Sequence, residues 1–345
     1  MVCGDVINDV LVETGTEPVA GADNRASIQV RPGGSAANQA AWLASLGVLV
    51  TFAGRAGAAD AEFHRRELAR HGIEVRLAAD EATPTGVIVV LIGADGDRTM
   101  ITDRGANLRL CVQDVPPCLL DGAALLHLTG YSFFDPRTRG VMLGLVGEAR
   151  RRGVPFTIDP GSAAFLNTLM PGEFLDWTRG AAACFPNLEE AAVLTGAADP
   201  AVMAASLAGN YDVAVIKLGA DGALYATADT ASVRVPAHSA VVRDTTGAGD
   251  AFCAGFLAAW LNGAPPQAAT EAAVITAARA VTTLGGRPFT ASCLERVQLA
   301  ERDRDDPVVA WMVLLDTSRV YARAIAEVIA KCDRSIAFLE CSGYC

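Results

Sequence analysis

Short apolar runs alternate with longer amphipathic segments along most of the chain. Strands that alternate with helices indicate a mainly parallel sheet with helices on both faces. Apolar runs predict strands at 124–129, 154–159, 182–185 and 212–217, followed by a hairpin-like piece at 223–235. Apolar positions three or four residues apart predict helices at 60–71, 137–152, 173–180, 188–195 and 200–208.

The N-terminal third departs from this alternation. An apolar run at 2–7 predicts a short buried strand. Two β-rich runs, 86–92 and 98–102, are joined by a Gly- and Asp-rich turn at 93–97, which is typical of a hairpin. We expect the β-rich segments 10–32 and 84–103 to form a small sheet apart from the main layer, as a lid over a site.

One glycine motif carries the clearest chemistry. Gly247, Ala248 and Gly249 lead directly into Asp250 and an apolar segment, 251–261, that predicts a helix. A helix N-terminus has unpaired N–H groups and about +0.5 of a charge, so it attracts anions. Asp250 is a candidate to take a proton from a hydroxyl, and an anion cradle beside a base suits phosphoryl transfer to an alcohol.

A second glycine motif precedes another predicted helix. Gly33 and Gly34 expose backbone donors, Ser35 can cap the helix, and Gly47 can end it. Asn38 offers both a donor and an acceptor, as a sugar hydroxyl requires. A plain helix cap also explains this motif.

In order and separation, the two motifs resemble the signatures of the ribokinase-like (phosphofructokinase-B type) carbohydrate kinases, and the resemblance covers about 1–295. It implies an α/β fold: a three-layer α/β/α sandwich with a mainly parallel central sheet and a small β-sheet lid. It also implies an ATP-dependent kinase that phosphorylates a hydroxymethyl group of a sugar or sugar acid. Asp250 would be the general base, and the amides of Gly247, Ala248 and Gly249 would stabilise the transferred phosphoryl group.

The resemblance implies substrate and nucleotide residues as well. Asp9, at the end of the first strand, would hold substrate hydroxyls together with Gly33, Gly34 and Asn38. The loop after strand 212–217 resembles the nucleotide-side loop. Its residues are Lys217, Gly219 and Gly222.

Two metal sites are implied in the same way. Asn187 and Glu190 resemble an Asn-x-x-Glu motif that supports Mg²⁺ through water, although the same pair fits a helix cap and its capping-box acid. Asp244 and Thr246 match a monovalent-cation site, completed by backbone carbonyls of 280–286, so K⁺ is a candidate ion.

Three positions depart from the sugar-kinase pattern and weaken an assignment to ribose. No arginine follows Asp159-Pro160, Ser35 stands where ribokinases have lysine, and 128–130 lacks a substrate-binding glutamate.

A nucleoside kinase of the adenosine or pseudouridine type is the main alternative. The lid segments contain no Phe, Tyr or Trp, which favours a compact sugar over a purine, although Phe133, Phe134 or Phe165 could supply a platform. A non-catalytic sugar or nucleotide sensor is a second alternative. A Rossmann dehydrogenase is disfavoured because no Gly-x-Gly-x-x-Gly follows the first strand.

Composition adds limits on partners and location. The net charge of −11 argues against nucleic acid, and no apolar run is long enough to predict a membrane span. The nine cysteines form no Cys-x-x-Cys pair, and the chain begins without an evident leader, which predicts a cytoplasmic protein. The family resemblance makes a homodimer plausible.

We expect a kinase domain over 1–300. A charged break at 301–307 then leads into a C-terminal extension, 301–345, whose apolar spacing predicts a helix over 308–331. The role of this extension stays open.

Overall fold

The computed structural model describes residues 1–93 and 98–289. The chain divides into two units, Met1–Pro288 and Phe289–Cys345. The predicted domain end near residue 300 and the predicted helix at 308–331 lie outside the described residues.

The main sheet is mostly parallel, which confirms the predicted α/β fold. Over the described residues its strand order is β13-β12-β11-β10-β9-β8-β1-β4-β5. Neighbours from β5 to β11 run parallel, and the predicted hairpin adds an antiparallel edge. The strands are β1 (Val2–Cys3), β4 (Thr51–Gly57), β5 (Glu74–Asp80), β8 (Leu126–Thr129), β9 (Phe156–Asp159), β10 (Ala183–Cys184), β11 (Val213–Lys217), β12 (Ala223–Thr227) and β13 (Thr230–Val235).

Helices pack against both faces of this sheet and make three layers. The core on one face includes Val2 of β1, and the core on the other includes the next residue, Cys3, because successive strand side chains point to opposite faces. One face carries α1 (Ser35–Ser45), α2 (Ala58–Ala69), α8 (Ala248–Leu261) and α9 (Pro266–Ala280). The other carries α3 (Pro136–Arg151), α4 (Ala163–Leu166), α5 (Pro171–Thr178), α6 (Leu188–Thr195) and α7 (Pro200–Ala208).

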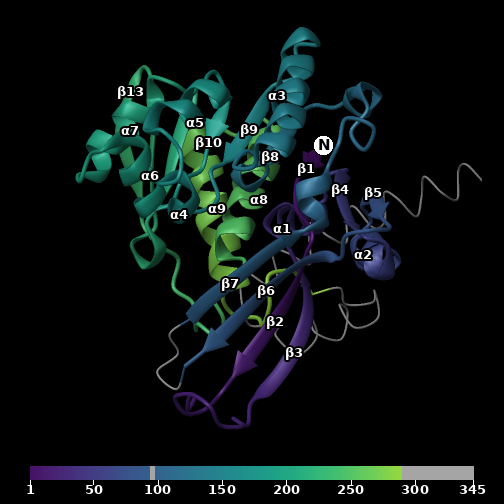
Figure 1. The fold of residues 1–345 in the computed structure, drawn as a ribbon. Coiled ribbons are helices and arrows are strands. Elements are labelled where there is room, and N and C mark those ends of the chain that lie inside the picture. The colour runs from purple at the N-terminus through teal and green to yellow at the C-terminus, as the bar shows by residue number, and fades with distance from the viewer. Residues whose placement is uncertain (94–97, 290–345) are drawn as a thin grey trace, which may run out of the picture. The chain divides into compact units, whose positions relative to one another are not determined.

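The lid is a separate sheet with the strand order β3-β2-β6-β7. Figure 1 shows it projecting away from the main sheet. Its strands are β2 (Ile7–Glu13), β3 (Ser27–Gly33), β6 (Thr85–Ile92) and β7 (Arg98–Gly105). The antiparallel pairing of β6 with β7 confirms the hairpin, whose turn at 94–97 lies outside the described residues.

The prediction of one strand over 2–7 was wrong. β1 ends at Cys3, and the chain enters the lid at Ile7, because the intervening segment bends at the root of the lid. The apolar pattern of the sequence predicted no element at β4, β5 or α9. Short 3₁₀ turns occupy Ala106–Arg109, Pro117–Leu120, Gly130–Ser132 and Gly219–Asp221.

Within residues 1–93 and 98–289, no single helix is both long and apolar enough to cross a membrane. The bent pair formed by α6 and α7 passes that test only by combined length and composition.

Candidate functional site

The glycine motif at 247–249 forms the start of α8. Gly247 is the N-cap, with a φ of 75°. A Cβ added there would lie 2.5 Å from the Gly286 Cα atom, so both the conformation and the packing require glycine. The Ala248 amide donates to the Thr245 carbonyl at 3.2 Å. The amides of Gly247 and Gly249 have no acceptor among the described residues, which leaves donors at this helix start.

Asp250 lies in the first turn of α8, and α1 holds its carboxylate. Oδ1 accepts from the Ser35 hydroxyl at 2.7 Å and from Gln39 Nε2 at 3.1 Å, and Oδ2 accepts from Asn38 Nδ2 at 3.0 Å. The structure therefore brings together the two glycine motifs.

The expected use of the second motif was partly wrong. Gly34, with a φ of 95°, is the N-cap of α1 in place of Ser35, whose hydroxyl bonds Asp250 instead. The amides of Ser35 and Ala36 do not face a ligand, because they donate to the Asp5 carboxylate at 3.3 and 3.0 Å. An internal carboxylate thus occupies this helix start.

Asp9 lies within lid strand β2 and not at the end of β1, which corrects the predicted placement. A Cβ at Gly33 would lie 2.1 Å from Asp9 Oδ2, so this glycine makes room for the carboxylate.

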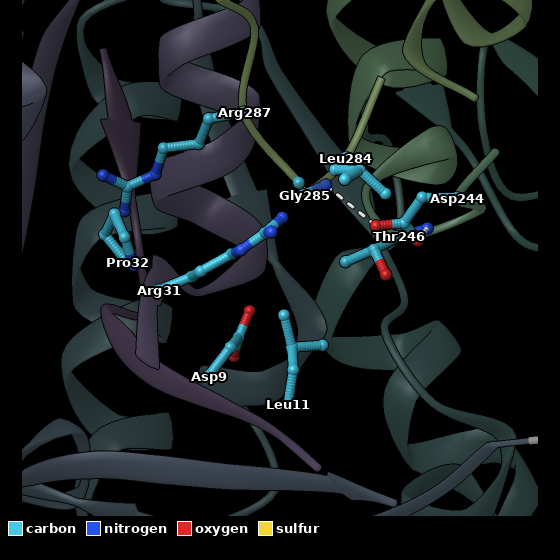
Figure 2. A pocket seen from close by; sticks show the side chains of 10 residues that line it. Asp9, Leu11, Arg31, Pro32, Asp244, Thr246, Leu284, Gly285 and Arg287 are labelled. Atoms are coloured by element: carbon cyan, nitrogen blue, oxygen red, sulfur yellow. Dashed lines mark hydrogen bonds between the residues drawn. The ribbon is translucent and has the colours of Figure 1, made fainter. Parts of the chain in front are cut away.

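A pocket of about 150 Å³ lies where the lid root meets the loops before α8 and after α9 (Figure 2). It brings Asp9 of the lid to the same cavity as Asp244 and Thr246. Its lining is Asp9, Leu11, Arg31, Pro32, Asp244, Thr246, Leu284, Gly285, Gly286 and Arg287.

Two carboxyl groups of this region have raised pKa values. Burial raises the pKa of Asp250 to about 7, assisted by the charge of Asp159 and opposed by its hydrogen bonds from α1. Burial also raises the pKa of Asp9 to about 7, opposed by the positive charge of Arg287. A carboxyl group with a pKa near 7 is suited to accept a proton near neutral pH.

Gln39 is a site residue that no sequence motif predicted. Its Nε2 donates to Asp250 Oδ1 and, at 2.8 Å, to Asp159 Oδ2. Its Oε1 accepts from His127 Nε2, and His127 Nδ1 accepts from the Thr157 hydroxyl at 2.7 Å. Burial lowers the pKa of His127 to about 3, so the ring is neutral and fixes the direction of the Gln39 amide.

Lys217 lies at the end of β11, next to the start of α8. Its ammonium group donates to Asp159 Oδ1 at 2.9 Å. A Cβ at Gly249 would lie 3.6 Å from the Lys217 Nζ atom, so the charge lies beside the first turn of α8. The side chain is only 14% exposed, and nearby Asp159 raises its pKa against the effect of burial.

The other predicted nucleotide residues follow in the 3₁₀ turn after β11. Gly219 and Gly222 have φ angles of 59° and 88°. A Cβ at Gly222 would lie 2.1 Å from the Val235 carbonyl oxygen, whereas Gly219 faces open space. Among the described residues, no hydrogen bond joins either glycine to the Asp250 cluster.

Asn187 and Glu190 form a reciprocal cap at the start of α6. The Glu190 amide donates to Asn187 Oδ1 at 2.8 Å, and the Asn187 amide donates to Glu190 Oε2 at 2.9 Å. Burial raises the pKa of Glu190 to about 7, opposed by the charge of Lys217. The helix-cap interpretation is therefore confirmed, and the carboxylate lies close enough to Lys217 for their charges to interact.

Asp244 links the loop before α8 to the loop after α9 by hydrogen bonds, and these two loops were expected to form a cation site. Its carboxylate accepts from the Thr246 amide at 2.9 Å and from the Gly285 amide at 2.8 Å. The Arg243 and Asp244 amides donate to the Val281 carbonyl, so the segment 280–286 lies against this turn.

Comparison with known proteins agrees with this geometry. Residues 1–292 match the model of the pfkB family of carbohydrate kinases. The chain is 31% identical over 288 residues to an ATP-dependent ribose-1-phosphate kinase of Halopiger xanaduensis, covering 81% of this chain and 92% of that one. It is 31% identical over 255 residues to an aminoimidazole riboside kinase of Salmonella typhimurium, covering 66% of this chain and 72% of that one.

The fold agrees with a solved structure as well. The ribokinase of Thermotoga maritima superposes with a TM-score of 0.71 at 24% identity, covering 84% of this chain and 95% of that one. The three-layer sandwich and the separate lid are therefore a ribokinase-like fold. The chain belongs to the pfkB family of carbohydrate kinases, ATP-dependent phosphotransferases that act on an alcohol group of a sugar or nucleoside.

Proposed function

We propose that this kinase transfers the γ-phosphoryl group of ATP to a hydroxymethyl group of a sugar, with Asp250 as the general base. The observation that carries the proposal is the position of Asp250 in the first turn of α8, beside unpaired amides and in hydrogen-bond contact with α1. Asp250 accepts the hydroxyl proton as the acceptor oxygen attacks the γ-phosphorus, and ADP leaves.

The start of α8 supplies the anion site for the transferred group. The amides of Gly247 and Gly249 stabilise the charge that develops on the phosphoryl oxygens, helped by the helix dipole, whereas the Ala248 amide donates to the Thr245 carbonyl. Lys217 adds a positive charge beside Gly249. We assign Gly219 and Gly222 to the nucleotide side, because their turn follows Lys217 directly.

Glu190 is the residue that would hold Mg²⁺, through water. Each of its oxygens accepts one Asn187 donor at 2.9 Å and keeps a second lone pair, and oxygen donors suit this ion. When bound, Mg²⁺ neutralises charge on the ATP phosphates. Asp244 and Thr246 would hold a monovalent cation such as K⁺, since the Asp244 carboxylate is buried at this turn and oxygen ligands suit hard cations.

The acceptor is held between the lid and α1 in this proposal. Asp9 and Asn38 offer oxygen and nitrogen atoms to its hydroxyls, and Gly33 and Gly34 keep the backbone close to Asp9 and Asp5. Closure of the lid would exclude water and limit hydrolysis of ATP.

A nucleoside acceptor is the second candidate, supported by one cluster of aromatic rings. The Phe134 ring stacks on the Phe165 ring with centroids 5.1 Å apart, and the centroid of the Tyr131 ring lies 6.0 Å from that of Phe165. All three side chains are partly exposed. Phe133 is fully buried in the core, so the suggestion that it serves as a platform was wrong. The named acceptors of the relatives likewise include both a sugar phosphate and a riboside.

A panel of acceptors tests the proposal. ADP formation is measured with ATP, Mg²⁺ and K⁺ for ribose, fructose, 2-keto-3-deoxygluconate, sugar phosphates, adenosine and pseudouridine. A sugar-type acceptor with the highest kcat/KM supports the primary proposal, and a nucleoside with the highest value supports the second. Ligand-induced thermal stabilisation without ADP formation for any acceptor would identify a non-catalytic sensor.

The pH dependence follows from the raised pKa of Asp250. The base must be deprotonated, so kcat/KM is expected to rise with pH through about 7 and to fall about tenfold per pH unit below it. The profile is measured at saturating ATP with an acceptor that does not itself titrate between pH 5 and 9. A profile that stays flat down to pH 5 would contradict the assignment.

A homodimer through the lid is proposed from its outer face. Val30, Val10, Val89 and Ile101 lie directly opposite one another across the four strands, so they share one face. Val30 is 66% exposed and Ile101 is 58% exposed, which leaves an apolar surface for a second copy.

Val30→Asp is expected to shift the full chain from dimer to monomer in sedimentation velocity, because a charge would be buried at this interface. Ser27→Asp, on the other face of the same strand, is the matched control and should stay dimeric. A monomeric wild-type chain, or an unchanged Val30→Asp dimer, would contradict the proposal.

A cytoplasmic location and a kinase domain that ends near residue 300 stay predictions.

A further inference from the structure

Two arginines, Arg31 and Arg287, line the pocket that contains Asp9. Figure 2 shows the guanidinium of Arg31 on the side of Gly285 and that of Arg287 beside Pro32. Within residues 1–93 and 98–289, neither forms an ion pair with a carboxylate, although other arginines of the described chain do, such as Arg55 and Arg104. The phosphoryl transfer proposed above needs neither positive charge.

Arg31 reaches the pocket from the lid. It lies opposite Asp9 in the pairing of β2 with β3, so both side chains are on the face of the lid opposite to the proposed dimer surface. Figure 2 shows the side chain extending toward Gly285, and a Cβ at Gly285 would lie 3.1 Å from Arg31 Nη1. Its Nη2 donates to the neutral Gln29 Oε1 at 2.7 Å, and the other guanidinium donors have no acceptor in the part of the chain that the structure describes.

Arg287 reaches the pocket from the loop after α9. Its Nε donates to Asn38 Oδ1 at 3.2 Å, and its Nη2 donates to the Gly33 carbonyl at 3.0 Å. Its Nη1 is buried and has no hydrogen-bond partner among residues 1–93 and 98–289. A buried charged donor without a partner is costly, and a ligand atom that accepts from it removes that cost.

We infer, on the basis of the proposed kinase function, that the acceptor is a sugar that already carries a phosphate monoester, which Arg31 and Arg287 bind in this pocket. Guanidinium groups match the geometry of phosphate oxygens. Two positive charges also suit a phosphate, which carries two negative charges, better than they suit a carboxylate, which carries one. Arg287 also bonds Asn38, which bonds Asp250, so the anion site and the base belong to one connected network.

The reaction is then a second phosphorylation of the same sugar. A bond forms between the free hydroxymethyl oxygen and the γ-phosphorus, and the bond from that phosphorus to the β–γ bridging oxygen breaks. The hydroxyl proton passes to Asp250. The products are ADP and a sugar bisphosphate.

Matched acceptor pairs test the inference with the full chain. Steady-state ADP formation is measured with ribose and its 1-phosphate and with fructose and its 1- and 6-phosphates, because each of these phosphates keeps a free hydroxymethyl group. 2-Keto-3-deoxygluconate represents a carboxylate, and adenosine represents a neutral nucleoside. We expect one sugar phosphate to have a kcat/KM at least about 10-fold above that of its neutral partner.

Arg31→Gln removes the charge and keeps an amide donor, so it is the decisive variant. It is expected to raise KM for that sugar phosphate by about 10- to 100-fold while changing KM for the neutral partner by less than about 3-fold. Arg31→Lys should retain part of the affinity. Arg66→Gln, an exposed arginine on α2, is the control and should match the wild type. Binding of the sugar phosphate without ATP, measured by calorimetry, should show the same loss in Arg31→Gln.

The outcomes separate this inference from the proposed function. If a neutral sugar, the sugar acid or adenosine has the highest kcat/KM, or if Arg31→Gln raises KM equally for both partners, the anion site is refuted while the kinase stands. If no acceptor supports ADP formation, both fail.

Discussion

Asp250→Asn is expected to lower kcat by at least about 10²-fold, because a positioned general base contributes about 10²- to 10⁴-fold. The amide keeps the size of the side chain and can still accept from Ser35 or Asn38, so the contact between α8 and α1 should persist. KM for ATP should change little, because the first-turn amides of α8 are unaffected. Steady-state kinetics at saturating acceptor measures both quantities.

Glu271→Gln is the matched control for this change. It makes the same carboxylate-to-amide substitution at an exposed position of α9 and should retain the wild-type kcat. A thermal melt of both variants verifies the fold. If Asp250→Asn turned over within a few-fold of the wild type, the assignment of the base would be wrong.

Gly247→Ala is expected to lower kcat by about 10²- to 10³-fold, the effect of displacing one donor from an anion hole. The φ of 75° disfavours alanine, and its Cβ would lie 2.5 Å from the Gly286 Cα atom. The first turn of α8 must therefore shift, and its amides move away from the phosphoryl group.

Gly263→Ala separates backbone strain from the anion site. Gly263 has a φ of 85° after the other end of α8, and a Cβ there meets nothing within 4 Å. The control should lose about 1 kcal/mol of stability and keep kcat within about 2-fold. Equal losses of kcat in the two variants would mean that Gly247 matters only for folding.

The sequence predicted the fold class and singled out the candidate site at the start of α8 because both depend on local signals. Apolar periodicity identified the alternating strands and helices of the C-terminal half, and glycine next to an acid marked the start of α8. The lid was recognised from β-rich segments, although the position of Asp9 within β2 depended on where the chain leaves the main sheet.

The remaining site residues have no local signal. Gln39 and His127 are linked only by the fold, which brings α1 over β8, and nothing near either residue marks them in the sequence. The Ser35 amide at the start of α1 donates to the Asp5 carboxylate, which lies 30 residues earlier in the sequence. Arg31 and Arg287 stand out only because the described chain gives them no carboxylate partner. Such features depend on tertiary contacts, which periodicity cannot report.

The most direct test of the central claim is a single-turnover experiment with ATP labelled at the γ-phosphate. The wild-type chain is mixed in excess with labelled ATP, Mg²⁺ and its best acceptor, and labelled product is followed by rapid quench. The account predicts transfer of the label to the acceptor, and transfer at least about 10²-fold slower in Asp250→Asn with ATP still bound. Transfer at the wild-type rate in Asp250→Asn would contradict it.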